Sequence, residues 1–234
     1  MSQKTVLITG ASRGIGLTFC KQYKALGWKI IAAVRNPEAA ANTLSDVGVD
    51  KIVQLEVTDE PSILNAAKEL EGEAIDLLLN NAGILDRLTL ETTTKEDMLR
   101  HYDINTVGPF LITRAFLPNL RAAVAKNGSA IVGNMSSWLG CITEINAGGP
   151  MALYAYRGSK SALNMVTAAY ALDLKADGII AVALHPGVVA TEITAFKGPV
   201  QPEDSVRGLI KVLSGVTMEQ TGKFLTFDER ELPW

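Results

Sequence analysis

The hydrophobic positions of this chain fall into two alternating patterns. Short runs in which nearly every residue is apolar predict buried strands at residues 5–8, 29–34, 51–57, 75–79, 130–135, 178–184 and 223–227. The stretches between them carry apolar residues at helical spacing and predict helices after residue 15, from 37, from about 58, at 95–105, up to 127, at 155–176 and at 203–214. Strands and helices that alternate this often predict a parallel sheet with helices on both faces.

The length and composition fit one globular domain. The chain has 234 residues, of which 47% are hydrophobic and 20% are charged, and no linker or repeat divides it. We therefore expect a single α/β domain over residues 1–234 with a doubly wound, mostly parallel sheet of about seven strands.

Charge and cysteine content exclude several functions. The net charge is −3 and the isoelectric point is near 5.5, so the chain offers no basic surface for nucleic acid. Every apolar run is shorter than a membrane span, and residues 1–4 lead directly into the first strand, so we expect a cytoplasmic protein without a signal peptide. Cys20 and Cys141 are isolated, which predicts apolar packing and neither a disulfide nor a metal site.

A glycine-rich turn joins the first strand to the first helix. Its sequence is Thr9-Gly10-Ala11-Ser12-Arg13-Gly14-Ile15-Gly16. The glycines leave backbone N–H groups bare at the positive end of the helix dipole, where a phosphate can approach closely. The spacing Gly-x-x-x-Gly-x-Gly differs from the commoner dinucleotide pattern Gly-x-Gly-x-x-Gly, and taken alone the cluster leaves a purely structural turn open.

Polar residues follow the carboxyl ends of the predicted strands, where parallel sheets bind ligands. Arg35 follows the second strand, nineteen residues after Gly16, at the place where an NAD-dependent fold presents a carboxylate to the ribose. Arg35 and Arg13 are suited instead to a 2′-phosphate, which predicts a preference for NADP(H) over the alternative of two solvated arginines. After the third strand, Glu56 can accept a hydrogen bond from an adenine amino group, with Val57 packed nearby.

A tyrosine and a lysine four residues apart carry the strongest chemical signal. Tyr156 and Lys160 share one face of the longest predicted helix, so the ammonium can stand near the phenol and lower its pKa toward neutrality. Ser136 and Ser137 follow the fifth strand, and one of these hydroxyls can converge with the phenol on a carbonyl oxygen. After the fourth strand, Asn81-Ala82-Gly83 permits close approach of a cofactor to the backbone, or forms an ordinary turn.

The order of these motifs resembles that of the single-domain short-chain dehydrogenases/reductases, most closely the carbonyl reductases of the C-factor and sniffer type. The resemblance runs from Thr5 to the C-terminus and implies a Rossmann-like fold with NADP(H) as the cofactor. It implies that Tyr156 is the general acid of carbonyl reduction and that Lys160 lowers the Tyr156 pKa and binds the nicotinamide ribose. Ser137 would hold the substrate oxygen, and Asn105 would position a water of the proton relay.

The resemblance also assigns residues after the sixth strand. It implies cofactor contacts from Pro186, Gly187, Val188 and Thr191, with His185 as a packing residue, and a mobile substrate lid at residues 192–201. The reaction centre is flanked by largely apolar side chains, which favour an apolar or aromatic ketone, aldehyde or quinone, or else simply pack the loops. The residues expected at the substrate are Ser137, Trp138, Tyr154 and Phe196, with Ile142, Met151 and Leu153 nearby.

Three function classes follow from these residues. The favoured one is an NADPH-dependent carbonyl reductase that acts on a small molecule. An alternative is a binding module that senses NADP(H) without turnover, although the complete Asn, Ser, Tyr and Lys set argues against it. A sugar-nucleotide epimerase would need a further substrate domain, and only 43 residues follow Thr191. The helices at 105–127 and 155–176 are similar to those through which family members pair, which predicts a homodimer or homotetramer.

Overall fold

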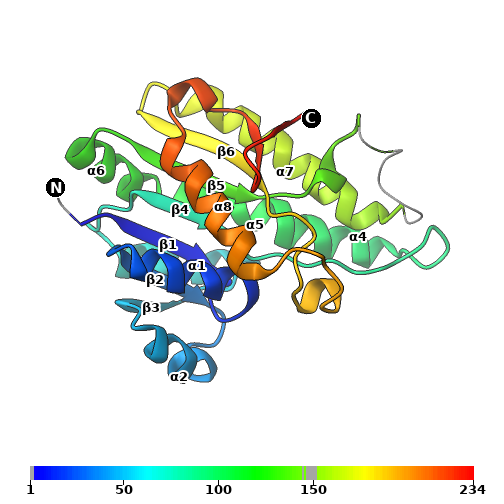
Figure 1. The fold of residues 1–234 in the computed structure, drawn as a ribbon, viewed down its shortest axis with the longest axis horizontal. Helices are drawn as coiled ribbons and strands as arrows, with labels where there is room; N and C mark the ends of the chain where they lie inside the picture. The colour runs from blue at the N-terminus through cyan, green and yellow to red at the C-terminus, as the bar shows by residue number, and fades with distance from the viewer. Residues whose placement is uncertain (1–2, 144, 146–151) are drawn as a thin grey trace.

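A single twisted sheet runs through the middle of the molecule (Figure 1). The computed structural model describes residues 3–143, 145 and 152–234. Within this part of the chain the sheet has eight strands. They are β1 (Thr5–Thr9), β2 (Lys29–Val34), β3 (Lys51–Gln54), β4 (Leu77–Asn80), β5 (Ala130–Met135), β6 (Ile179–His185), β7 (Phe224–Thr226) and β8 (Glu231–Leu232).

The strand order is β3-β2-β1-β4-β5-β6-β7-β8. Strands β1 to β7 pair in parallel, and only β8 lies antiparallel, against β7. The chain moves outward from β1 in one direction and from β4 in the other, so the order reverses between these two strands. Open α/β sheets bind ligands at this reversal, beyond the carboxyl ends of the strands. The predicted doubly wound, mostly parallel sheet is confirmed, with one short strand more than the sequence indicates.

Helices cover both faces of the sheet (Figure 1). One layer contains α1, α2 and α8, and the other contains α3, α5, α6 and α7. In β1, Val6 and Ile8 face the first layer while Leu7 faces the second, because successive side chains of a strand point to opposite sides. The helices are α1 (Gly14–Ala25), α2 (Pro37–Val47), α3 (Glu60–Glu69), α4 (Lys95–Tyr102), α5 (Gly108–Ala115), α6 (Leu117–Asn127), α7 (Tyr154–Asp173) and α8 (Pro202–Gly215).

Two helix starts show how the sequence sets the boundaries. The Asn36 side chain accepts a hydrogen bond from the Ala39 N–H at 3.0 Å, and the Asp59 side chain accepts one from the Ser62 N–H at 3.2 Å. Each of these helices, α2 and α3, also has a proline in its first turn. A side-chain cap satisfies a free N–H, and proline fits the first turn because it has no N–H to satisfy. The predicted helix starts near 37 and 58–61 are therefore confirmed.

Other boundaries differ from the apolar pattern. Strand β3 ends at Gln54, three residues before the predicted end of the strand at 57. Glu56 and Val57 therefore lie beyond the strand, at the edge of the sheet where its carboxyl ends meet. A π-helical turn, η1 (Asp103–Val107), joins α4 to α5 where the sequence indicates only an interruption near 108–109. Among the helices that the structure describes, none combines the length and the apolar content that crossing a membrane requires.

Candidate active site

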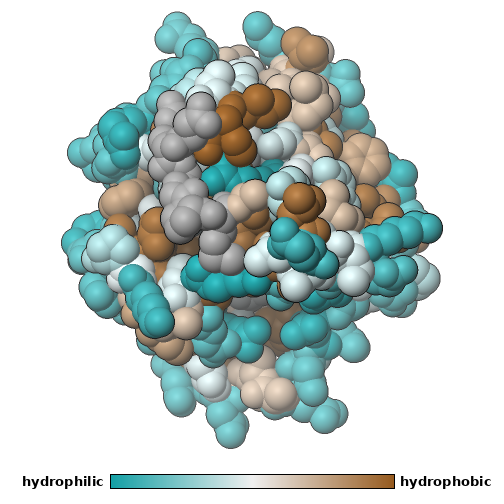
Figure 2. Space-filling view, turned by 90° about the vertical axis from the view of Figure 1, so that its right-hand side faces the viewer, coloured by the Kyte–Doolittle hydropathy of each residue, from teal (hydrophilic) through white to brown (hydrophobic). Residues whose placement is uncertain are grey.

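A cavity of about 360 Å³ lies at the carboxyl edge of the sheet. Figure 2 looks onto this edge and shows hydrophobic and hydrophilic side chains side by side on it. The lining joins segments that are far apart in the sequence, since each follows a different strand. It comprises Ile15, Asn81, Gly83, Ile84, Leu85, Arg87, Met135, Ser136, Ser137, Trp138, Leu139, Leu153, Tyr156, Lys160, His185, Pro186, Gly187, Val188, Val189, Thr191, Ile193 and Thr194.

The glycine loop between β1 and α1 is shaped by close backbone contact. Gly10 and Gly14 have φ angles of +65° and +53°, in the left-handed region that favours glycine. A Cβ atom at Gly16 would lie 2.2 Å from the Gly10 carbonyl oxygen, so this position also requires glycine. The Asn81 side chain donates to the Thr9 carbonyl at 2.9 Å and thereby ties the loop to the end of β4. The predicted phosphate cradle thus has a rigid backbone at the start of a helix.

Tyr156 and Lys160 both line the cavity from helix α7. The Lys160 Nζ lies 5.9 Å from the centre of the Tyr156 ring and donates a hydrogen bond to the Met135 carbonyl at 2.7 Å. Tyr156 is 8% exposed and Lys160 is 5% exposed. The predicted placement of the two side chains on one helical face is therefore present in the structure.

Burial sets the protonation of this pair. Desolvation raises the pKa of Tyr156 to about 12, against a smaller lowering by a hydrogen bond from Ser137. Desolvation lowers the pKa of Lys160 to about 7. The shift at Tyr156 is opposite in direction to the one expected from a neighbouring ammonium, because removal from water disfavours the charged form of both groups.

The two serines after β5 point to different partners. The Ser136 hydroxyl donates to Oδ1 of Asn164 on α7 at 2.6 Å. The Ser137 hydroxyl accepts a hydrogen bond from the Leu139 N–H at 3.2 Å and interacts with Tyr156. Because Ser136 is engaged by the helix, Ser137 is the hydroxyl that stands beside the phenol.

Asn105 lies in the π-helical turn η1 and is fully buried. Its Oδ1 accepts from the Ile84 N–H at 2.9 Å, and its Nδ2 donates to the Ile84 carbonyl and to the Ser159 hydroxyl, both at 3.0 Å. Thr106 donates to the Ser159 carbonyl at 2.8 Å, and the Ser159 hydroxyl donates to the Tyr156 carbonyl at 2.8 Å. Asn105 therefore connects the segment after β4 to the turn of α7 that carries Tyr156, and Ser159 is a positioning residue that sequence reasoning did not identify.

The arginines proposed for a ribose phosphate face carboxylates. Arg13 Nη1 lies 3.0 Å from Glu192 Oε2, and Arg35 Nε lies 3.9 Å from Glu56 Oε2. The side chains of Arg13 and Arg35 are 69% and 73% exposed, so both guanidinium groups remain accessible from solvent. Exposed pairs of this kind are weak and exchange partners readily.

The segment after β6 closes one side of the cavity. Gly187 has a φ of +82°. The Thr191 side chain packs against the glycine loop, because a Cβ atom at Gly14 would lie 3.6 Å from Thr191 Cγ2. The base of the expected lid at 192–201 is fixed by hydrogen bonds from the Ala190 N–H to the Val200 carbonyl at 2.8 Å and from the Val200 N–H to the Val188 carbonyl at 3.2 Å.

The residues predicted at the substrate divide into two groups. Ser137 and Trp138 line the cavity, and Leu153 lines it as well. Tyr154 and Phe196 lie outside the lining and are 43% and 69% exposed. Met151 lies outside the described residues. The lining also includes Ile84, Leu85 and Arg87, which sequence reasoning missed because the segment after β4 has no secondary-structure pattern of its own.

The contacts of His185 fit the predicted packing role, and its buried imidazole predicts that stability depends on pH. Its Nδ1 accepts from the Trp138 N–H at 3.4 Å, and burial lowers its pKa from 6.5 to about 4. The unfolded chain therefore binds a proton between pH 6.5 and 4 that the folded protein does not, and stability is full above pH 6.5 and falls below it. We expect urea denaturation to give an unfolding free energy about 2 kcal/mol smaller at pH 5 than at pH 7. The variant His185→Gln should lose most of this difference; an equal decrease in the variant would contradict the assignment.

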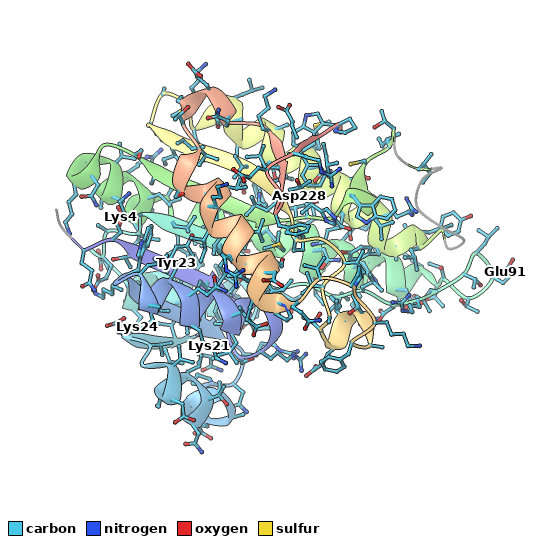
Figure 3. The ribbon with its side chains drawn as sticks, viewed as in Figure 1. Lys4, Lys21, Tyr23, Lys24, Glu91 and Asp228 are labelled. Carbon is cyan, nitrogen blue, oxygen red and sulfur yellow. The ribbon has the colours of Figure 1, made fainter. Side chains whose placement is uncertain are left out.

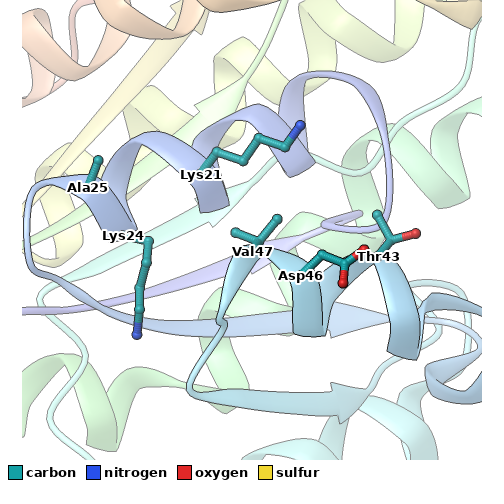
Figure 4. Close-up of a pocket in the computed structure, with 6 residues that line it drawn as sticks. All are labelled: Lys21, Lys24, Ala25, Thr43, Asp46 and Val47. Atoms are coloured by element: carbon teal, nitrogen blue, oxygen red, sulfur yellow. The ribbon is translucent and has the colours of Figure 1, made fainter.

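A second hollow of about 530 Å³ lies between α1 and α2 (Figure 4). Its lining consists of surface side chains and includes none of the candidate site residues. The Lys24 ammonium there is held by Asp50 at 3.0 Å. The lining is formed by Lys21, Lys24, Ala25, Thr43, Asp46 and Val47. We therefore regard the cavity at the sheet edge as the functional site.

The fold and the site define an α/β oxidoreductase domain with a glycine loop after its first strand and a Tyr–Lys pair over the same sheet edge. The family model described as short chain dehydrogenase matches residues 4–201, and the chain belongs to this family.

Relatives and solved structures resemble the chain over most of its length. It is 36% identical to the C-signal protein of Myxococcus xanthus over 161 residues, covering 68% of this chain and 93% of that protein. It is 34% identical to a 1-hydroxy-2-glutathionyl-2-methyl-3-butene dehydrogenase of Rhodococcus sp. (strain AD45), covering 98% and 99%. The NADPH-bound carbonyl reductase from chicken fatty liver superposes with a TM-score of 0.92 at 36% identity, and the carbonyl reductase Sniffer of D. melanogaster with 0.92 at 30%, each covering 100% of both chains.

Proposed function

We propose that the protein is an NADPH-dependent reductase that converts a ketone, aldehyde or quinone carbonyl into an alcohol. This proposal rests on one observation: the side chains of Ser137, Tyr156 and Lys160 line the same cavity. Ile15, at the start of α1 beside the glycine loop, lines that cavity too. The similarity to carbonyl reductases supports the reaction class.

The residues present fit a dinucleotide. The backbone at Gly16 is so close to Gly10 that a side chain would fill the loop, and this is the shape that a pyrophosphate at a helix start requires. Arg13 and Arg35 would receive a 2′-phosphate in place of their carboxylate partners. The chicken carbonyl reductase was solved with NADPH, which supports this choice of cofactor.

The proposed cofactor contacts follow the edge of the sheet. We assign the full set to the residues that the sequence analysis predicts there. They are Gly10, Ser12, Arg13, Gly14, Ile15, Gly16, Arg35, Glu56, Val57, Asn81, Ala82, Gly83, Tyr156, Lys160, Pro186, Gly187, Val188 and Thr191.

The chain's own residues would bind the carbonyl and supply the proton. A bound NADPH would provide the hydride that the carbonyl carbon accepts. Ser137 would donate a hydrogen bond to the carbonyl oxygen, and Tyr156 would transfer its phenolic proton to that oxygen as the alcohol forms. Because burial keeps the Tyr156 pKa near 12, the phenol holds its proton at neutral pH and is ready to donate it. Lys160 would stabilise the phenolate that results, and Asn105 would help to return a proton through a bound water.

The lining favours an apolar substrate. The lining includes the apolar side chains of Ile84, Trp138, Leu153 and Ile193 together with Tyr156. Residues 192–201, which include the exposed Phe196, would close over the substrate as a lid. A homodimer or homotetramer formed through α5, α6 and α7 stays a prediction, as does the cytoplasmic location.

The purified protein should consume NADPH with aromatic aldehydes, ketones or quinones. We expect turnover with such compounds, followed as loss of absorbance at the nicotinamide band, and formation of the corresponding alcohol or hydroquinone. A panel in which only anions without an apolar body react would overturn the substrate class, and absence of NADPH oxidation across the whole panel would overturn the proposed reaction.

A further inference from the structure

Arg87 brings a positive charge to an otherwise apolar part of the cavity. Among the described residues that line this cavity, the basic side chains are Lys160, Arg87 and His185, and there is no aspartate or glutamate. Lys160 is buried and bound to the Met135 carbonyl, whereas Arg87 is exposed. Leu85 and Arg87 line the cavity beside Ile84, on the segment that follows β4.

The backbone of this segment is fixed from the side of α4 and η1. The Ile84 N–H donates to Asn105 Oδ1 at 2.9 Å, and the Asp86 N–H donates to His101 Nε2 at 3.2 Å. The His101 Nδ1 lies 2.8 Å from the Asp97 carbonyl, so it donates there while Nε2 accepts. Arg87 therefore follows directly after backbone that the buried side chains of Asn105 and His101 hold in place, and the segment then continues to an exposed tip at Glu91 (Figure 3).

The carboxylate next to Arg87 is occupied elsewhere. Asp86 pairs with Arg100 of α4, and its Oδ2 lies 3.6 Å from His101 Nε2. Within residues 3–143, 145 and 152–234, no acidic side chain forms an ion pair with Arg87, while Arg13 and Arg35 each have one carboxylate partner and Arg100 has two. A guanidinium beside an apolar lining without a carboxylate is suited to a planar oxyanion on a ligand.

We propose that Arg87 binds an oxyanion on the substrate, so that the preferred substrates carry the reacting carbonyl on an apolar body and a carboxylate or phosphate at its other end. This inference rests on the proposed carbonyl reduction. The apolar body contacts Leu85, Trp138 and Leu153, the carbonyl lies at Tyr156, and the oxyanion lies at Arg87 near the cavity mouth. Arg87 is separate from the phosphate cradle, which is built after β1 and β2 by the glycine loop, Arg13 and Arg35.

The test compares three aldehydes of similar size and reactivity. They are 4-formylbenzoate, 4-formylphenyl phosphate and the neutral 4-formylbenzamide, each assayed with NADPH at low ionic strength. We expect the wild type to favour at least one anion over the amide, and Arg87→Gln to reduce that ratio of kcat/KM about tenfold, mainly through KM. Arg87→Lys should recover part of the preference, since it keeps the charge but loses the planar donor pair. Comparison of the two anions shows whether a carboxylate or a phosphate is bound.

A matched control removes a positive charge at the other edge of the sheet. Arg121 on α6 pairs with Asp177 at 2.8 Å, and Arg121→Gln should leave all three rates and their ratios unchanged. Equal preference for the anions in wild type and Arg87→Gln, or no preference in either protein, would overturn the role of Arg87 while the proposed reduction stands. Calorimetric titration of 4-formylbenzoate measures binding without turnover. If this binding depends on Arg87 but the protein does not oxidise NADPH, the oxyanion site is supported and the proposed carbonyl reduction is wrong.

Discussion

The variant Tyr156→Phe should lose about a thousandfold in kcat for carbonyl reduction while it still binds NADPH. The phenylalanine ring fills the same buried space, but it has no proton to transfer to the carbonyl oxygen. Because the Tyr156 pKa of about 12 keeps the phenol protonated at neutral pH, the full loss should be seen at pH 7. Steady-state rates with saturating NADPH and a separate measurement of NADPH binding by fluorescence test this prediction.

Tyr170→Phe is the matched control on the same helix. The Tyr170 hydroxyl donates to the Phe110 carbonyl at 3.1 Å, away from the cavity, so its removal should lower stability by about 1 kcal/mol and leave kcat unchanged. If Tyr156→Phe keeps its catalytic rate, Tyr156 is not the proton donor. A biological response that persists in Tyr156→Phe would favour the alternative of a protein that senses NADP(H) without turnover.

The variant Arg35→Asp should shift the NADPH-to-NADH ratio of kcat/KM by about a hundredfold toward NADH. The arginine now stands 3.9 Å from Glu56, and its replacement would place two carboxylates where we propose that the 2′-phosphate binds. A carboxylate at this position repels a phosphate but accepts hydrogen bonds from the hydroxyls of an NADH ribose. Initial rates with each cofactor at a fixed carbonyl substrate measure the ratio.

Arg121→Asp controls for the change in net charge. It makes the same charge reversal on α6, at the opposite edge of the sheet, so the cofactor ratio should remain that of the wild type. An unchanged ratio in Arg35→Asp would remove Arg35 from the cofactor site. If Arg35→Asp keeps about half of the preference for NADPH over NADH, the 2′-phosphate would be bound mainly by Arg13 of the glycine loop.

Much of the fold could be predicted because its strands are buried on both faces. Residues such as Leu78 in β4 and Val132 in β5 lie in continuous apolar runs, and these runs are visible without any knowledge of tertiary contacts. The glycine loop and the pair Tyr156 and Lys160 could also be found, since each is recognised by residue spacing within one segment.

Features that depend on distant partners could not be predicted in this way. Strand β8 is two residues long and is formed by pairing with β7, so no apolar run marks it. The family resemblance implies Ser137, but the physical reason against Ser136 is its hydrogen bond to Asn164, which is 28 residues away in the sequence. The direction of the Tyr156 pKa shift depends on burial by several segments at once, and a helical spacing of four residues contains no information about that burial.

The π-helical turn η1 sets the rotational phase of the helix that follows it. Asn105 and Thr106 are consecutive in this turn, and both side chains hydrogen-bond to Ser159 of α7. The wider turn takes up one additional residue, and α5 still presents Ile112 to the sheet. The turn therefore serves two surfaces at once: its side chains hold the helix that carries Tyr156, and the helix that continues from it packs against the core.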